Sequence, residues 1–597
     1  HRRTFCFPMS IPLTKSIPRL RLHRHPWLDA LTCGGALVAA FLLVRLLGSP
    51  PQRLAVTADS TRFAPESAFA LTRVLADSFQ NRVTGTLASR RAAGWIQARF
   101  DALGLVTEVR DFPVTLRGMA LRGRNVIARS GGAVPGAIVV LAHYDGQTTS
   151  GQSAGDDAAG VGVLMELARV LELHGHRRPI TYVATDAQEW GSIGAASYVQ
   201  LVERPQDIVA VISLDHVENG IGSSVHISGV GQGGGFAPLW LRNAAADAFA
   251  AGSVRTTDVG PVTEWFQRTV RLSLSDQGPF VNAGIPAVNL GVESRRPEIA
   301  RFLYHTPGDR WETLRLSSFM LLGAGTERLV LALDRADRMS GPFDYLALDR
   351  DRMVKGFAIL LSAIALFLPL ALATLEAWQS ARADPASRAA IRSEIVRAGS
   401  WWLIGVVGLA VLGLTVQTGM LPRYELYPAT VRDPFLYTVR WGPVIVTVAA
   451  LTGASLTLSW LRRRSKLGAS HPLAGRATAL STLLALAAIA LTRNPFAAVT
   501  LLMLPAWLWP WIEPTRRPLT GAASILVVLA SAVPFLAAAY VFARHLEVGT
   551  RVAYYLFLQS AYGAWTPLTV LMFVVAVLAA SRLVGTATTR PLPETGD

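Results

Sequence analysis

The 597-residue sequence predicts an α/β domain that lies between an N-terminal transmembrane helix and a C-terminal all-α membrane domain. Apolar residues make up 51% of the chain and charged residues only 16%, a balance that is unusual for a soluble protein. The apolar excess lies near the N-terminus and in the C-terminal part of the chain. The middle alternates helical patterns with short apolar strands, as expected for a central sheet flanked by helices.

The N-terminal apolar run covers residues 28–47 and is long enough to cross a bilayer as a helix. Residues 1–27 before it are basic, so we expect them in the cytoplasm. A cleavable signal peptide is the rival interpretation, but such a segment has a short apolar core and ends in a small-residue cleavage site. This run instead ends at Gly48-Ser49-Pro50-Pro51, which favours an uncleaved anchor.

Seven further candidate spans make up a predicted membrane domain at residues 356–586, followed by a cytoplasmic tail at 587–597. Arginine-rich loops fall on one side of this arrangement if both termini are cytoplasmic and the middle domain lies outside, as the positive-inside rule requires. The centres of the spans carry almost no ionisable residues, which favours a structural or partner-binding role over transport. The candidate spans are residues 356–376, 399–420, 441–461, 477–492, 495–512, 519–541 and 566–586.

The formal net charge of +16 comes mainly from arginines that are scattered or flank the apolar runs. No nucleic-acid-binding motif and no basic helical stripe accompanies them, so the charge indicates a membrane protein rather than a DNA- or RNA-binding one. We therefore expect membrane lipid, and not nucleic acid, as a partner. The two cysteines, Cys6 and Cys33, cannot supply a disulfide framework.

Polar residues follow three of the apolar strands in the middle domain, which is predicted at residues 55–340. His143 follows one strand, Gln188-Glu189 follows the next, and Asp215 follows a third. Open α/β sheets bind their ligands at this carboxyl edge, so the sequence predicts a single site there. The expected strands are residues 125–128, 137–142, 180–185 and 209–214, and the expected helices are 88–103 and 160–173.

The residue types in this series are those of a two-metal site. Its histidines are His143 and His305, and its candidate carboxylates are Asp145, Asp156, Asp157, Glu189 and Asp215. Two histidines and three carboxylates can hold two divalent ions around one shared carboxylate, and the water between such ions is a strong nucleophile near neutral pH. Because the set contains no cysteine, zinc, cobalt and manganese all fit the ligand types.

The middle domain contains the motifs Leu141–Asp145, Ala154–Gly160, Asp186–Gly191, Leu214–Asp215, Ser275–Phe280 and Tyr304–Asp309. These motifs resemble those of peptidase family M28, which contains zinc aminopeptidases and carboxypeptidases. The resemblance covers about residues 60–335 and implies a zinc peptidase domain with a mixed central sheet flanked by helices. The whole arrangement resembles the membrane-bound branch of the family, which includes endoplasmic-reticulum and vacuolar membrane metallopeptidases.

The resemblance implies an aminopeptidase-like exopeptidase that acts on peptide substrates with two zinc ions. Carboxypeptidase specificity stays open at this point. The resemblance also implies that Asp145 lies outside the ligand set and orients His143, because an imidazole ligand often needs such a partner. The implied ligand sets, which share one carboxylate, are His143, Asp156 and Asp215 for one zinc ion and Asp156, Glu189 and His305 for the other.

Gln188 departs from the family pattern, because the family has at this position a glutamate that takes a proton from the bridging water. A glutamine amide can orient a water but cannot accept that proton. Loss of general acid–base catalysis costs about 10²–10⁴-fold in rate. Three readings follow: a working peptidase in which another carboxylate, such as Asp186 or Glu218, accepts the proton; a weak or inactive pseudopeptidase that binds peptides or partners; and another reaction, such as glutaminyl cyclisation.

Two local patterns receive structural interpretations. Trp507, Trp509 and Trp511 lie near a span end and are interpreted as an interfacial aromatic belt. The glycine-rich segment Gly229–Gly235 lacks the strand, helix and acidic partner of a dinucleotide-binding fingerprint, so we expect a flexible loop near the substrate cleft.

The arginine- and alanine-rich composition is typical of a bacterial protein, which would place the chain in the inner membrane and the middle domain in the periplasm.

Overall fold

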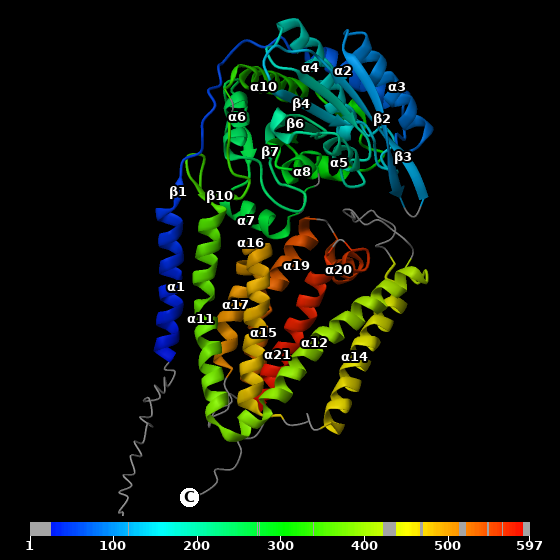
Figure 1. Cartoon of the computed structure of the whole chain (residues 1–597). Helices are drawn as coiled ribbons and strands as arrows, with labels where there is room; N and C mark the ends of the chain where they lie inside the picture. The colour runs from blue at the N-terminus through cyan, green and yellow to red at the C-terminus, as the bar shows by residue number, and fades with distance from the viewer. Residues whose placement is uncertain are drawn as a thin grey trace, which may run out of the picture.

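The structure is a computed structural model in which an α/β domain lies above a bundle of long helices (Figure 1). Both parts agree with the fold class expected from the sequence: a mixed sheet flanked by helices, an N-terminal helix and a C-terminal all-helical region. The structure describes residues 26–116, 119–271, 273, 275–337, 339–421, 438–465, 470–512, 521–545, 548–563 and 565–588.

An eight-stranded mixed sheet forms the centre of the α/β domain, in the order β2-β3-β5-β4-β6-β9-β7-β8. The four central strands, β5, β4, β6 and β9, are parallel, and antiparallel pairs flank them. Every residue of β5 and six of the seven in β4 are buried, as expected for strands covered on both faces. The strands are β2 (Val106–Leu116), β3 (Met119–Arg129), β4 (Ala137–His143), β5 (Ile180–Thr185), β6 (Ile208–Val217), β7 (Gly222–Ser228), β8 (Thr256–Asp258) and β9 (Ala287–Ser294).

Helices cover this sheet and complete the apolar core. Helix α4 packs on β4 and β6, and α10 packs on β7 and β9 and against α6, α2 and α4. The shorter helices α5 and α8 contact each other, and α8 also contacts β6 and β9. The helices are α2 (Pro65–Ser78), α3 (Leu87–Asp101), α4 (Ala159–His174), α5 (Ile193–Gln200), α6 (Leu239–Ala250), α8 (Gln277–Asn282), α9 (Pro297–Leu303) and α10 (Leu316–Arg335).

Seven of the described helices are long and apolar enough to cross a membrane by length and composition. One of them, α10, is largely buried against the sheet and is a core helix of the α/β domain. The other six form the bundle, together with two shorter apolar helical segments, Ala30–Leu46 and Pro495–Trp511. The bundle consists of α1 (Pro26–Leu46), α11 (Gly356–Ala383), α12 (Pro385–Gln417), α14 (Trp441–Arg464), α15 (Pro472–Arg493), the segment 495–511, α18 (Gly521–Ser531), α19 (Val533–His545), α20 (Val552–Ala561) and α21 (Pro567–Thr588).

Two of the three clustered tryptophans, the half-buried Trp507 and the buried Trp509, bond to neighbouring helices of the bundle. Trp507 Nε1 donates a hydrogen bond of 2.8 Å to the carbonyl of Leu366 in α11. Trp509 is 4% exposed, and its Nε1 donates to Ser531 Oγ at 3.0 Å. Trp511 alone is exposed. The indole donors of Trp507 and Trp509 thus bond to neighbouring helices, and the interpretation of the cluster as an interfacial belt stays a prediction.

Two connections join the α/β domain to the bundle. A small antiparallel sheet, β1-β11-β10, lies where α1 ends and α11 begins; its strands are β1 (Gly48–Ser49), β10 (Tyr345–Ala347) and β11 (Met353–Lys355). The second connection is α7 (Pro261–Val270), which rests on the short helix α16 (Pro495–Ala497) (Figure 1). The α/β domain therefore has fixed contacts with the upper end of the bundle.

Candidate metal centre

Five loops or strand ends bring the candidate ligands together at the carboxyl edge of the parallel strands. His143 is the last residue of β4, and Asp215 lies near the end of β6. Glu189 follows β5, Asp156 precedes α4 in an irregular turn, and His305 follows α9. This is the edge at which an open α/β sheet binds its ligand.

The five side chains form two groups that share Asp156. In one group, His143 Nε2 lies 3.2 Å from Asp156 Oδ1 and 3.5 Å from Asp215 Oδ1. In the other, His305 Nε2 lies 2.9 Å from Asp156 Oδ2 and 3.2 Å from Glu189 Oε2. All five side chains are buried. The two oxygens of one carboxylate therefore face histidines from two separate parts of the chain.

The donor set fits two divalent cations. In each group the candidate ligand atoms lie within 4.8 Å of one another, and all are imidazole nitrogens or carboxylate oxygens, which zinc accepts. Among the described residues, the buried Glu189 Oε1 has no hydrogen-bond partner. Buried carboxylates are unfavourable unless they are paired or coordinate metals. Nearby positive charge would therefore stabilise the three buried carboxylates, Asp156, Glu189 and Asp215.

Asp145 supports both sides of the site with one buried carboxylate. Its Oδ1 lies 3.3 Å from His143 Nδ1, on the side of the imidazole that faces away from Asp156. The backbone N–H of Gln188 donates to the same oxygen at 3.0 Å, and that of Glu189 donates to Oδ2 at 3.3 Å. Asp145 thus lies where a residue that orients His143 is expected, and it also fixes the turn that carries Glu189.

Asp309 holds the turn that carries Asp156, a contact that the sequence alone did not assign. The N–H of Gly155 donates to Asp309 Oδ1 at 2.7 Å, and the N–H of Asp156 donates to Oδ2 at 3.3 Å. Asn219 Nδ2 donates to Oδ1 at 3.1 Å. In the sequence, Asp309 ends the motif Tyr304–Asp309 and lies four residues after His305.

The carboxylates around the two candidate histidine ligands favour the protonated forms of both imidazoles. Burial lowers the pKa of His305, but the carboxylates of Glu189 and Asp156 outweigh burial and raise the pKa to about 10. Burial likewise disfavours the charged form of His143, yet hydrogen bonds to Asp145, Asp156 and Asp215 hold its pKa well above its usual range. Because metal ligands must be deprotonated, metal binding releases these protons.

Gln188 lies beside the ligand set, with its amide pointing at a carboxylate. Its Nε2 donates to Asp215 Oδ2 at 3.4 Å. The two candidate substitute bases bond elsewhere. Asp186 accepts hydrogen bonds from Thr84 Oγ1 at 2.8 Å and from the N–H groups of Ala187 and Arg124, whereas Glu218 Oε2 accepts from the Ser294 N–H at 2.6 Å. The structure does not bring either carboxylate into contact with the ligands.

Asp276 is a buried acid in the motif Ser275–Phe280 to which the sequence alone assigned no role. Thr185 Oγ1 donates to its Oδ2, and among the described residues its buried Oδ1 has no hydrogen-bond partner. Burial raises the pKa of Asp276 to about 7, against the opposing charge of His143 and the bond from Thr185. Its position could not be read from the strand pattern, because it precedes α8 and does not follow a strand of the parallel set.

Several non-glycine residues around the site adopt left-handed backbone conformations. Ala187, His216 and His305 have φ of 60°, 71° and 57°. Such conformations are unfavourable for residues with a side chain and cluster at functional sites. His216 lies at the edge of the site, where its ring centroid is 4.9 Å from that of Tyr304, which stacks on His305 at 3.7 Å.

The glycine-rich segment Gly229–Gly235 borders the site, as expected, but hydrogen bonds hold it at both ends. Gln232 Nε2 donates to the carbonyl of Gly191 at 3.1 Å, and the Gly191 N–H donates to the Gln188 carbonyl at 2.9 Å. On its other side, the Gly233 N–H donates to the carbonyl of Arg271, directly after α7, at 3.1 Å. The segment therefore connects the Gln188-Glu189 turn to α7.

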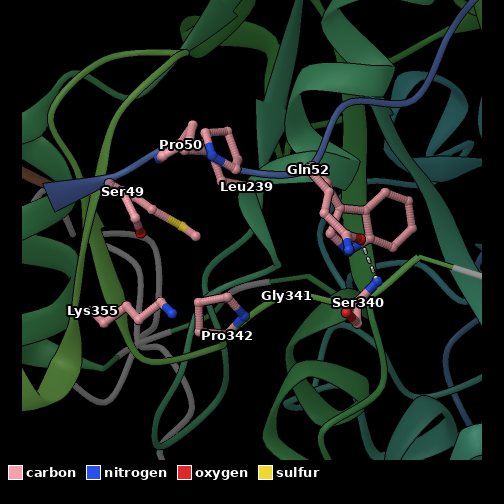
Figure 2. A pocket seen from close by; sticks show the side chains of 11 residues that line it. Ser49, Pro50, Gln52, Leu239, Ser340, Gly341, Pro342 and Lys355 are labelled. Carbon is pink, nitrogen blue, oxygen red and sulfur yellow. Dashed lines mark hydrogen bonds between the residues drawn. The ribbon is translucent and has the colours of Figure 1, made fainter.

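A separate pocket of about 250 Å³ lies at the junction with the bundle, away from the candidate ligands. Figure 2 shows Lys355 and Pro342 on the opposite side of this pocket from Ser49 and Pro50. Gln52, which also lines it, accepts a hydrogen bond from the Ser340 N–H at 2.8 Å. None of the candidate ligands lines this pocket, so we place the chemistry at the carboxyl edge of the sheet.

Comparisons with known proteins agree with this placement. Residues 125–327 match Peptidase family M28. The alkaline phosphatase isozyme conversion protein of Escherichia coli (strain K12) is 28% identical over 280 residues, which are 41% of this chain and 79% of that protein. Aminopeptidase YwaD of Bacillus subtilis (strain 168) is 29% identical over 183 residues, which are 30% of this chain and 37% of that protein.

Solved structures with a similar fold include a zinc aminopeptidase from Bacillus subtilis and a glutaminyl cyclase from Porphyromonas gingivalis. The aminopeptidase is 16% identical, with 48% of this chain and 99% of that chain covered and a TM-score of 0.41. The cyclase is 21% identical, with 45% and 99% covered and a TM-score of 0.40. The match of residues 125–327 places this segment of the α/β domain in peptidase family M28.

Proposed function

We propose that this chain is a membrane-anchored metallopeptidase whose α/β domain hydrolyses peptide bonds near a chain end with two zinc ions. Family membership and the aminopeptidase relative support a hydrolase. The proposal rests mainly on the position of the Asp156 carboxylate. Each of its two oxygens faces a histidine of a different ligand group. His143, Asp156 and Asp215 would hold one ion, and Asp156, Glu189 and His305 the other.

The residues around these ligands hold them in position for metal binding. When bound, two zinc ions would supply a water nucleophile near neutral pH and polarise the scissile carbonyl. Asp145 keeps the His143 imidazole in the orientation that directs Nε2 at Asp156. Asp309 keeps the Asp156 turn in place through two backbone N–H groups. The Gln188 amide can orient a water by hydrogen bonds, and Asp276 is the buried acid with a free oxygen that could accept a proton.

Gln188 also supports a second candidate function, a catalytically weak pseudopeptidase that binds peptides or partner proteins. Its amide donates toward Asp215 and cannot take a proton from water. Both candidates use the same ligands and the same zinc ions, so metal content does not separate them. They differ in the rate of hydrolysis that the native residue permits.

Peptide hydrolysis by three forms of the full-length chain separates the two candidates. The native chain, Gln188→Glu and Glu189→Ala are purified in detergent, loaded with zinc and given a mixed peptide library whose products are identified by mass spectrometry. We expect the native chain to release terminal residues, and Glu189→Ala to lose this activity with one of its metal ligands. Gln188→Glu should raise kcat by about 10²–10⁴-fold if proton transfer limits the native chain.

Each result decides between the candidates. Native activity that depends on Glu189 supports the peptidase and a substitute proton acceptor. Activity in Gln188→Glu alone supports the pseudopeptidase, because the metal site then works once a proton acceptor is restored. If none of the three forms hydrolyses peptides with zinc bound, the result contradicts the peptidase, and it also contradicts the expectation that Gln188→Glu restores hydrolysis. Cyclised N-terminal glutamine among the products would favour glutaminyl cyclisation.

The proposed location is the membrane, with the α/β domain on the side where α15 turns into α16. Peptides are the proposed substrates, and lipid surrounds the bundle. We propose the bacterial inner membrane and a periplasmic α/β domain, which rests on the arginine-rich loops at the opposite end of the helices.

A further inference from the structure

The first part of α12 and the last turns of α14 and α21 lie at the end of the bundle away from the α/β domain (Figure 1), and each carries an arginine. Arg397 lies in the first part of α12, Arg462 lies in the last turn of α14, and Arg582 lies near the end of α21. All three are partly buried. We refer to Arg397, Arg462 and Arg582 as the arginine cluster.

A single carboxylate lies within this cluster and is shared. Glu394 in α12 is buried, and Arg582 binds it with two donors, Nε to Oε2 at 3.1 Å and Nη2 to Oε1 at 2.5 Å. Arg397 Nη1 lies 3.4 Å from the same Oε1. The hydroxyl of Ser470 also donates to Oε1 at 3.0 Å. The acceptor capacity of Glu394 is therefore largely used by Arg582 and Ser470.

The guanidinium groups of Arg397 and Arg462 have fewer contacts with a carboxylate than that of Arg582 among the described residues. The hydrogen bonds of Arg462 go to hydroxyl groups, Ser400 Oγ at 3.0 Å and Ser459 Oγ at 3.1 Å. In the described part of the chain, Arg397 Nε is buried and has no hydrogen-bond partner. The other nearby carboxylate, Asp384, lies 3.2 Å from His471 Nε2. Among the described residues, three guanidinium groups thus face one carboxylate, which leaves two positive charges unbalanced within that part of the chain.

We propose that the arginine cluster binds the phosphate group of an anionic phospholipid from the leaflet at this end of the bundle. Guanidinium groups match phosphate oxygens with parallel, charge-assisted hydrogen bonds. Basic pockets between transmembrane helices are known to bind such headgroups. A phosphate would supply acceptors for Arg397 Nε and Arg462 and would balance the excess charge. This inference is independent of peptide hydrolysis.

Neighbouring arginines provide a matched comparison, because a general attraction to anionic lipid would involve them equally. Arg463 and Arg464 lie beside Arg462 at the same end of α14, and both are exposed. Arg464 stacks on Trp460 of its own helix, with 4.0 Å between Cζ and the ring centroid. Replacing these two arginines removes the same charge as replacing Arg397 and Arg462, but leaves the cluster intact.

Thermal unfolding of the full-length chain in detergent micelles tests the site. The native chain, Arg397→Gln/Arg462→Gln and Arg463→Gln/Arg464→Gln are each titrated with phosphatidylglycerol, phosphatidylcholine and inorganic phosphate. We expect phosphatidylglycerol to raise the unfolding temperature of the native chain and of the Arg463/Arg464 variant more than phosphatidylcholine does. In the Arg397/Arg462 variant, the phosphatidylglycerol concentration for half of the shift should rise about tenfold or more.

Three results would overturn the proposal. Equal losses in the two double variants would show diffuse attraction to the surface. Equal shifts in unfolding temperature with phosphatidylglycerol and phosphatidylcholine would show that the headgroup charge does not contribute to binding. An equal shift with inorganic phosphate would show a site for a free anion rather than a lipid. If the Arg397/Arg462 variant does not fold, Arg462→Gln is used alone, because that side chain bonds only to two hydroxyl groups among the described residues.

Discussion

At the residue scale, Asp156 joins the two halves of the candidate metal centre. Its Oδ1 faces His143 and its Oδ2 faces His305, which lie 162 residues apart in the chain. Asp309 fixes the backbone on which it lies, and Asp145 fixes the imidazole opposite. Loss of one ligand would leave other buried charges without a partner, so we expect substitutions here to affect metal binding and stability together.

Asp276 predicts a pH dependence that can be separated from that of the ligands. Its folded pKa, about 7, lies above its ordinary value of 3.8 because of burial. Its stabilising contribution is therefore complete at low pH and is lost as the pH rises from about 4 to 7. In chelator-treated full-length chain, thermal unfolding between pH 4 and 8 should show native stability falling relative to Asp276→Asn, by up to a few kcal/mol.

The comparison with Asp276→Asn cancels the titration of the histidines, which are present in both forms. Asn keeps an acceptor for the Thr185 hydroxyl. Parallel unfolding curves for the two forms across this pH range would contradict a raised pKa at Asp276.

The sequence named all five candidate ligands because each lies in a short motif with its own spacing, and the structure brings these five together. The supporting residues were harder to predict. Asp276 and Asp309 make contacts that form only when segments distant in sequence meet, and neither residue follows a strand of the parallel set, so the strand pattern identifies no role for them. The suggested base Asp186 had the right position in sequence, but its carboxylate points to Thr84 and backbone N–H groups.

At the element scale, α7 connects the α/β domain to the helical bundle. Asn494, in the turn between α15 and α16, donates from Nδ2 to the carbonyls of Arg268 at 2.9 Å and Thr269 at 3.1 Å. Trp265 Nε1 donates to Thr500 Oγ1 at 2.8 Å. From the end of α7, hydrogen bonds run through Gly233 and Gln232 to the turn that carries Glu189.

Asn494→Ala should loosen α7, because it leaves two carbonyls of that helix without a donor. We expect a loss of roughly 1–3 kcal/mol in local stability, since Asn494 is buried. Hydrogen–deuterium exchange of residues 261–271 should therefore accelerate. Thr492→Ala is the control, because Thr492 is exposed and its hydroxyl bonds within its own helix. Equal exchange in native chain and Asn494→Ala would contradict this role for the turn.

Elements with a strong apolar pattern could be predicted closely, whereas those made by long-range pairing could not. The strand expected at 180–185 has those bounds, and the strand expected at 137–142 extends by one residue to His143. The strands of the small sheet β1-β11-β10 are two or three residues long, too short for any periodicity to indicate. They exist because residues 48–49 and 353–355 meet beside the ends of α1 and α11.

At the scale of the whole molecule, the arrangement of the helices predicts which sites share a side of the membrane. The α/β domain contacts the turn at Asn494, whereas the arginine cluster lies at the opposite end of the helices. Each of the eight expected spans overlaps a helical segment among the described residues, because a continuous apolar run is the clearest signal in the sequence; that these segments cross a membrane stays a prediction. The docking of α7 on α16 could not be predicted, since it depends on a few specific hydrogen bonds.

Cysteine labelling in intact cells tests this sidedness. Cys6 and Cys33 are first replaced by serine, and single cysteines are then introduced at Glu203 in the α/β domain and at Arg464 at the end of α14, both of which are exposed. A membrane-impermeant maleimide should label Glu203→Cys in intact cells and Arg464→Cys only after permeabilisation. Labelling of both from the same side would contradict a bundle that crosses the membrane in the expected orientation.

The central claim is that two ligand groups joined by Asp156 hold two zinc ions. The most direct measurement is the zinc-to-chain ratio of the purified full-length protein, determined by elemental mass spectrometry after dialysis. We predict a ratio near two for the native chain and for Asp207→Asn, which alters an exposed carboxylate of the same domain, and a ratio below one for Asp156→Asn. A native chain without zinc, or an Asp156→Asn variant with the native ratio, would contradict the account.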